Sequence, residues 1–165
     1  MITNNFGVYN FNQNYNYNNS LNFKSDKAIY VCSRLASGYR KSPKHPTIRD
    51  FINSNMAKAM NYAKQIVKKG DFPYWNHSTW PNFVDDTKPK ERNIAIKGCL
   101  DLVSRCEALV YFGKPIGGMK QEIDKAKNVG MVVMSSKEYF KMKPKNFDKL
   151  VEDSSHYKKL RNALT

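Results

Sequence analysis

Residues 107–134 read EALVYFGKPIGGMKQEIDKAKNVGMVVM, and this stretch decides the fold. It begins with a short apolar run and ends with another, MVVM. Between them the spacing is helical, with Met119, Ile123 and Ala126 on one face. Short, continuous apolar strands joined through a helix are typical of a parallel sheet that helices cover.

The same alternation precedes this stretch. KAIYVCS at 27–33 predicts a buried strand, and the apolar spacing of 48–70 predicts a helix that Gly70 ends. FPYWNH at 72–77 predicts a second strand, and 91–106 a second helix with Pro89 in its first turn. Strand and helix therefore alternate three times, which predicts an α/β protein with helices on both faces of the sheet.

Composition divides the chain into three parts. Residues 1–23 carry no charged side chain but nine asparagines and six aromatic residues, which is typical of an appended arm. Residues 24–135 hold the strand and helix pattern. Residues 136–165 are interpreted as a basic tail of one or two helices, including SSHYKKLRNAL with its serine start.

The charge balance favours anionic partners. The 165 residues hold 28 Lys and Arg against 14 Asp and Glu, a net charge of +14. A field of this sign attracts nucleic acid, phosphorylated nucleotides or acidic proteins. The chain has neither a secretory signal nor the roughly 18 apolar residues in a row that a membrane span needs, so we expect a cytoplasmic protein without a membrane partner.

Metal and cofactor chemistry is not indicated. Three cysteines (Cys32, Cys99 and Cys106) form no CxxC pair, and the three histidines lack ligand spacing. The expectation is reduced, packed thiols, with no metal site and no cofactor.

Ligands of parallel sheets bind beyond the carboxyl ends of the strands, where strand order reverses. There the sequence places Gly117 and Gly118, and then Glu122 in the first turn of the predicted helix. Glycine lets a sugar or phosphate approach the backbone, and a helix N-terminus favours anions. The alternative is that Glu122 only caps the helix, because the helix dipole favours an acid in the first turn.

The order of several short motifs resembles the nucleoside 2-deoxyribosyltransferase-like superfamily, in particular its small uncharacterised bacterial and phage branch. The motifs are IYVCS, G-x-x-P-x-x-x-H from Gly70 to His77, ER at 91–92, CEALVYFG and GGMKQEIDKA, and together they cover roughly 27–134. The resemblance implies a Rossmann-like (flavodoxin-like) three-layer sandwich with a parallel sheet of four to five strands.

The resemblance also implies a site. Glu122 would be a nucleophile that attacks the anomeric carbon of a deoxyribosyl group, with Glu107 as the second catalytic acid. Candidates for ligand binding are Ser33, Arg34, His77, Arg92, Gly117, Gly118 and Met119. For the arginines the alternative is a solvated surface charge, and for His77 it is a structural hydrogen bond. The chain departs from the family pattern in having Ile116 where an aspartate is usual, Met119 for threonine and Glu107 for aspartate.

Two functions remain open from the sequence. One is a nucleoside- or nucleotide-binding protein, an N-glycosidase or deoxyribosyltransferase acting on a nucleoside monophosphate or a related nucleotide. The other is a non-enzymatic basic protein that engages nucleic acid or a nucleoprotein, such as a phage-encoded inhibitor of host defence. Its candidate contacts are Arg40, Lys41, Lys44, Lys158, Lys159 and Arg161. A homo-oligomer is also expected, and the N-terminal arm is compatible with one.

Overall fold

Four parallel strands form a single sheet in the computed structural model, which describes residues 27–163. The strands are β1 (Ala28–Cys32), β2 (Phe72–Tyr74), β3 (Ala108–Tyr111) and β4 (Val132–Ser135). Their order is β2-β1-β3-β4, so the chain moves to one side of β1 and then returns to the other. Strand order thus reverses at β1, which is where open α/β sheets form their ligand crevice.

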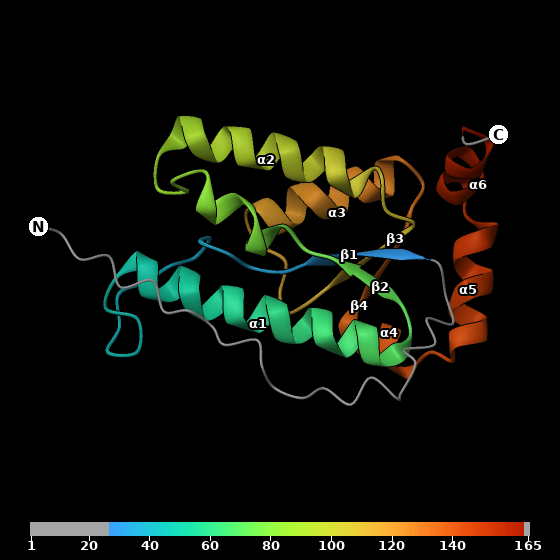
Figure 1. Ribbon diagram of the computed structural model, residues 1–165, viewed down its shortest axis with the longest axis horizontal. Helices are drawn as coiled ribbons and strands as arrows, with labels where there is room; N and C mark the ends of the chain where they lie inside the picture. Colours follow the sequence, from blue (N-terminus) through green and yellow to red (C-terminus); the bar gives the residue numbers. More distant parts are fainter. Residues whose placement is uncertain (1–26, 164–165) are drawn as a thin grey trace, which may run out of the picture.

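Helices cover both faces of this sheet, as Figure 1 shows. The helices α2 (Pro89–Val103) and α3 (Gly118–Asn128) lie on one face, and α1 (Ile48–Lys69) lies on the other with α4 (Ser136–Lys141). Two more helices, α5 (Pro144–Asp153) and α6 (Ser155–Asn162), follow at the end of the chain. The protein is therefore a Rossmann-like α/β fold of three layers, as the sequence predicted.

Each face of the sheet has its own core, because alternate residues of a strand point to opposite faces. Ile29 and Val31 of β1 pack towards α1, in a cluster that includes Ile66. Tyr30 and Cys32 point the other way, into a cluster built with α2 and α3. This alternation decides which β1 side chains can reach the functional site.

The limits of α1 follow from local chemistry that the sequence displays. Thr47 and Asp50 form a capping box at its start, each side chain accepting a backbone N–H of the other. Gly70 ends the helix with φ 99°, a left-handed conformation that favours glycine. Pro89 likewise opens α2, as expected.

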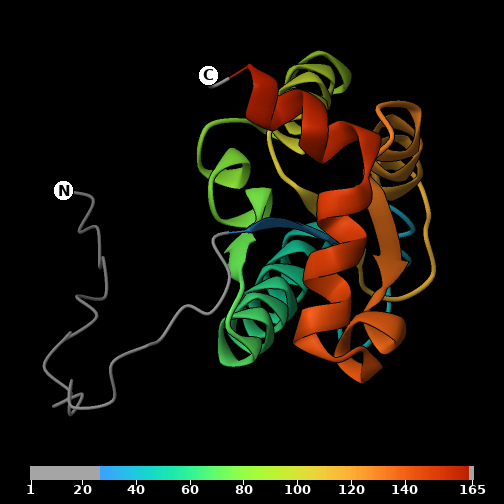
Figure 2. The ribbon, with the colours of Figure 1, turned by 90° about the vertical axis from the view of Figure 1, so that its right-hand side faces the viewer.

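The segment after β4 is part of the domain and contains three helices rather than the one or two predicted. Tyr139, Phe147 and Val151 are fully buried in the core on the α1 side of the sheet. His156 is also buried, with Nε2 2.9 Å from the carbonyl oxygen of Cys106. Figure 2 shows α5 and α6 lying across the end of the sheet where the strands begin.

The asparagine- and aromatic-rich arm, residues 1–23, lies outside the described residues. Among the helices that the structure describes, none is long and apolar enough to cross a membrane.

Candidate functional site

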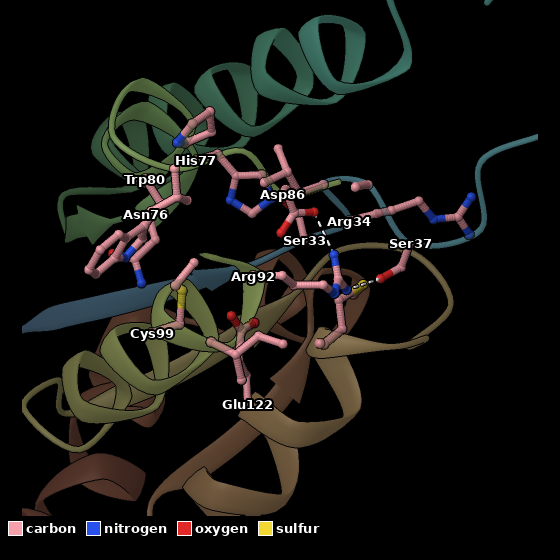
Figure 3. Close-up of a pocket in the computed structure, with 18 of the residues that line it drawn as sticks. Ser33, Arg34, Ser37, Asn76, His77, Trp80, Asp86, Arg92, Cys99 and Glu122 are labelled. Atoms are coloured by element: carbon pink, nitrogen blue, oxygen red, sulfur yellow. Dashed lines mark hydrogen bonds and ion pairs between the residues drawn. The ribbon is translucent and has the colours of Figure 1, made fainter. Parts of the chain in front are cut away.

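A pocket lies at the carboxyl edge of the sheet, beside the point where strand order reverses. It encloses a cavity of about 70 Å³ between the loop after β1, the segment from Asn76 to Asp86, and the helices α2 and α3. The middle segment contains two short 3₁₀ turns, Asn76–Ser78 and Trp80–Asn82. Figure 3 shows side chains from all four elements turned towards one another, with the Glu122 carboxylate among them.

Glu122 is held by a hydrogen-bonded chain that begins on the other side of the pocket. The Tyr30 hydroxyl donates to Oε1 of Glu122 at 2.8 Å. In turn, Nδ2 of Asn76 donates to the Tyr30 hydroxyl oxygen at 3.0 Å. Tyr30 is only 1% exposed and Asn76 is also buried, so this chain fixes the carboxylate from within the protein.

Glu122 does not cap α3, contrary to one reading of the sequence. The helix begins at Gly118, so its first turn contains no acidic residue and Glu122 lies beyond it. No side chain caps this helix start. Because its Oε1 accepts from Tyr30, Glu122 has a partner in the pocket that a capping role would not require.

Burial raises the pKa of Glu122 to about 7, although the Cys32 thiol and the Tyr30 hydroxyl partly oppose the shift. The Tyr30 pKa is raised well above 10, chiefly by burial and then by the nearby Glu122, so Tyr30 stays protonated and donates. Cys99 also lines the pocket, and burial raises the pKa of its thiol to about 11. Of these three side chains, Glu122 is therefore the one whose ionisation changes near neutral pH.

A second polar chain crosses the same pocket. Arg92 on α2 contacts Asp86, with Nη1 2.5 Å from Oδ2, and its Nη2 donates to Oγ of Ser37 at 3.1 Å. Both contacts appear as dashed lines in Figure 3. Burial raises the pKa of Asp86, with Arg92 opposing. Arg92 was predicted to bind ligand; it lines the pocket, and its guanidinium joins two loops of the pocket wall.

Ser33 and His77 line the pocket as predicted, and they lie next to each other. Oγ of Ser33 is 3.4 Å from Nε2 of His77, and both residues are buried. Burial lowers the pKa of His77, while contacts with the backbone of Arg34 and Ser33 oppose the shift. His77 is therefore neutral at pH 7, so one of its ring nitrogens can donate a hydrogen bond while the other accepts one.

The glycine turn contributes less directly than expected. Gly118 and Met119 line the pocket, but Gly117 does not. Gly117 has φ 50°, and a side chain there would place its Cβ 2.3 Å from Oγ of Ser37. It is thus required for close packing between the loop after β1 and the start of α3.

Glu107 lies at the opposite edge of the sheet, immediately before β3. Its Oε2 accepts the backbone N–H of Ala28 at 2.5 Å, where β1 begins. Glu122, on α3, accepts its hydrogen bond from Tyr30 in the middle of β1. The structure therefore does not bring the two predicted catalytic acids together, and Glu107 instead fixes the start of the β1 strand.

The predicted nucleic-acid contacts separate into two groups at opposite ends of the molecule. Arg40, Lys41 and Lys44 are exposed on the loop before α1, at the carboxyl edge of the sheet. The other group, Lys158, Lys159 and Arg161, is exposed on α6 at the other end in Figure 1. They do not form one continuous basic surface.

Trp80 closes the pocket on the side of α2. Its ring lies against Gly98, where an added Cβ would come within 2.1 Å of Cζ2 of the indole. The Trp80 Nε1–H is buried and has no hydrogen-bond partner among the residues that the structure describes. Because the Trp80 indole lines the pocket, its fluorescence should change when a ligand enters.

Sequence reasoning missed several members of the site. Tyr30, Asn76 and Asp86 are absent from the predicted site residues, and Cys99 was expected to be a packed thiol. The signal for Tyr30 was the alternation of β1, which places it on the face that α3 covers. Asp86 and Asn76 lie in an irregular segment that offers no period from which to infer direction.

Metal binding finds no support in the described residues. Within 27–163, no three side chains of His, Cys, Asp or Glu are grouped so that they could hold a metal ion.

The fold and the pocket define a class of protein, namely an α/β protein with a parallel sheet and a partly buried carboxyl in a pocket at the carboxyl edge of its strands. The chain belongs to the family described as a domain of unknown function, DUF7768, whose model matches residues 27–136. A search of curated proteins finds no match. The matched residues contain the whole sheet and pocket, whereas nearly all of α4 to α6 follows them.

Proposed function

We propose that the protein is a nucleotide-directed glycosyl-transfer enzyme, an N-glycosidase or deoxyribosyltransferase, in which Glu122 is the nucleophile. The observation that carries the proposal is the Glu122 carboxyl, enclosed in a pocket and fixed by Tyr30, with its pKa raised to about 7. Such perturbed carboxyls cluster at functional sites. The resemblance to the nucleoside 2-deoxyribosyltransferase-like superfamily supports the same residue.

The proposed chemistry is a double displacement at the anomeric carbon. An oxygen of ionised Glu122 bonds to C1′, the bond from C1′ to the base nitrogen breaks, and its electron pair leaves with the base. Water, or a second base, then attacks C1′ and releases the carboxylate. The Tyr30 hydroxyl favours the ionised carboxylate before attack and holds its orientation.

The departing base needs a proton, and Asp86 is our candidate donor. It is the other carboxyl that lines the pocket. Burial raises the pKa of Asp86, while its ion pair with Arg92 opposes the shift. Glu107 is excluded from this step because it lies at the other edge of the sheet.

Substrate entry requires the pocket to open. Its cavity of about 70 Å³ is smaller than the roughly 300 Å³ at which small-molecule pockets begin. The segment that carries Trp80 is the simplest part to move, because it consists of short 3₁₀ turns and loop. Ligand binding should therefore change the environment of Trp80.

Base release from a nucleotide panel tests the proposal. Purified protein is incubated with the common ribo- and deoxyribonucleosides and their phosphates, and free base is measured by chromatography. Glu122→Gln should abolish release and keep the fold, as judged by circular dichroism. Glu107→Gln is the matched control and should retain activity. If the unaltered protein frees no base from any member, the enzymatic proposal is wrong.

A non-enzymatic function is the second candidate, favoured by the exposed group of Arg40, Lys41 and Lys44 on the loop before α1. In that case the protein would engage nucleic acid or a nucleoprotein through this loop. Polymer binding should then weaken steeply with salt, roughly in proportion to the number of phosphates contacted. Substituting the three residues by alanine should reduce both the affinity and the salt slope.

A further inference from the structure

A second cavity lies at the same edge of the sheet, on the α1 face. It measures about 170 Å³, compared with about 70 Å³ for the Glu122 pocket. Three of its lining residues are cationic: Arg34 after β1, Lys58 on α1 and Lys114 after β3. None of its lining residues is acidic. We call it the basic cavity.

The wall of the basic cavity is rigid and partly apolar. The rings of Tyr62 and Phe112 stack with centroids 4.1 Å apart and an angle of 14° between their planes. The buried side chain of Asn55 donates to the Leu35 carbonyl oxygen at 2.7 Å and accepts from Nζ of Lys58 at 3.4 Å. Arg34 is half-buried beside this wall, whereas Lys58 and Lys114 are exposed at its rim.

One side of the basic cavity is open to a ligand. Gly113 is exposed with φ 84°, and a Cβ built on it would meet no atom within 4 Å. The left-handed backbone conformation, rather than crowding, therefore accounts for a glycine at position 113. Without a side chain there, a ligand can approach the backbone. An anion can reach the cations from this side.

The basic cavity and the Glu122 pocket share two lining residues, Ser33 and Arg34. These residues follow the carboxyl end of β1, where strand order reverses. A ligand with its sugar beside Glu122 can therefore extend over this segment and place a charged group in the basic cavity. Gly117, where the sequence suggested phosphate binding, lines neither cavity.

We propose that the basic cavity binds the 5′-phosphate chain of the substrate, which makes the substrate a nucleoside di- or triphosphate. The inference rests on the proposed function for the position of the sugar. Three cations without a carboxylate suit a chain that carries three or four negative charges better than a free nucleoside, which carries none.

Binding to the Glu122→Gln protein tests the inference without turnover. Calorimetry compares each of the four common deoxynucleosides with its 5′-mono-, di- and triphosphate, and with inorganic pyrophosphate alone. We expect the affinity of the diphosphate to exceed that of the nucleoside by about tenfold or more, since hydrogen bonds to charged groups contribute most. The double substitution Lys58→Ala and Lys114→Ala should remove this gain and abolish pyrophosphate binding.

The control is Lys64→Ala with Lys120→Ala, which removes the same charge from α1 and α3. Both lysines are exposed and line neither cavity. This control should keep the gain with phosphorylation. Equal affinity along the phosphorylation series, or an equal loss in the two double variants, would overturn the inference.

The inference and the proposed function fail in different ways. If the unaltered protein releases no base but pyrophosphate binding depends on Lys58 and Lys114, the phosphate site stands and the enzymatic proposal is wrong. If base is released equally from nucleosides and triphosphates, and the lysine substitutions leave kcat/KM unchanged, the enzyme stands and the phosphate site is wrong.

Discussion

Replacing Glu122 by glutamine should change how the stability of the protein depends on pH. In the folded protein the pKa of Glu122 is raised from 4.5 to about 7. Between these values the folded state binds more protons than the unfolded state, so stability falls as the pH rises. The loss begins near the unfolded pKa, is complete above the folded pKa, and is absent from the glutamine variant.

The magnitude follows from the shift. One pKa unit corresponds to about 1.4 kcal/mol, so full ionisation of Glu122 costs about 3 kcal/mol. At about pH 5 only about 1 kcal/mol of this is lost, because the folded carboxyl is still protonated. Glutamine keeps an oxygen that can accept from Tyr30. The stability of Glu122→Gln relative to the unaltered protein should therefore increase by about 2 kcal/mol between about pH 5 and about pH 8.

Urea denaturation followed by tryptophan fluorescence measures this difference. Glu91→Gln is the control, because a hydrogen bond from the Asp85 backbone lowers the pKa of that exposed carboxyl. Glu91 is ionised throughout the range, so its variant should differ from the unaltered protein by a constant amount. A constant difference for Glu122→Gln as well would refute the reasoning, since it would mean that the carboxyl is solvated.

Three further substitutions test other parts of the structure. Tyr30→Phe removes a donor that lowers the pKa of Glu122, so the acid limb of the pH profile of kcat/KM should move to higher pH. An unchanged acid limb would mean that Tyr30 does not influence the ionisation of Glu122. Gly98→Ala should displace Trp80, shift its fluorescence and cost about 1–3 kcal/mol, whereas an unchanged spectrum would contradict the packing. Val151→Ala should cost about 2 kcal/mol in a single urea transition, and a separate transition would mean that the C-terminal helices fold independently.

The alternation of strands and helices could be predicted because each element carries its own period. The strand at 28–32 and the helix ended by Gly70 needed only local signals: a continuous apolar run, helical apolar spacing and a glycine stop. Parallel order then follows from the helices between the strands. Residues that contact one another from different helices and strands have no such local pattern in the sequence.

The α2 helix illustrates how a periodic pattern can be placed on the wrong face. An apolar period alone would turn the large side chain of Ile94 inward, but Ile94 is 57% exposed. Ala95 and Val103 are buried instead, and Cys99 lies between them on the same face. Small side chains allow α2 to approach the sheet and Trp80 closely, so size decided the orientation where hydrophobicity suggested otherwise.

The C-terminal helices were underestimated for a related reason. Their many lysines dominate the composition, whereas the core contacts come from a few apolar positions such as Phe147 and Val151. Lys27 adds a link that no local pattern contains, with Nζ 3.0 Å from Glu152 and 3.4 Å from Asp148. Such pairings, more than 120 residues apart in sequence, depend on the completed sheet.

The position of Glu122 is costly, and the cost favours a functional explanation. A residue needed only at the start of α3 would lie in its first turn and face the free backbone N–H groups, where an acid is stabilising. Glu122 lies further along the helix and accepts from Tyr30 inside a pocket, at a price of about 3 kcal/mol above pH 7. A glutamine or an apolar residue would avoid that loss and keep the packing. A chain that retains the carboxyl, together with the Asn76 and Tyr30 hydrogen bonds that orient it, is arranged for what the carboxylate can do to a bound molecule.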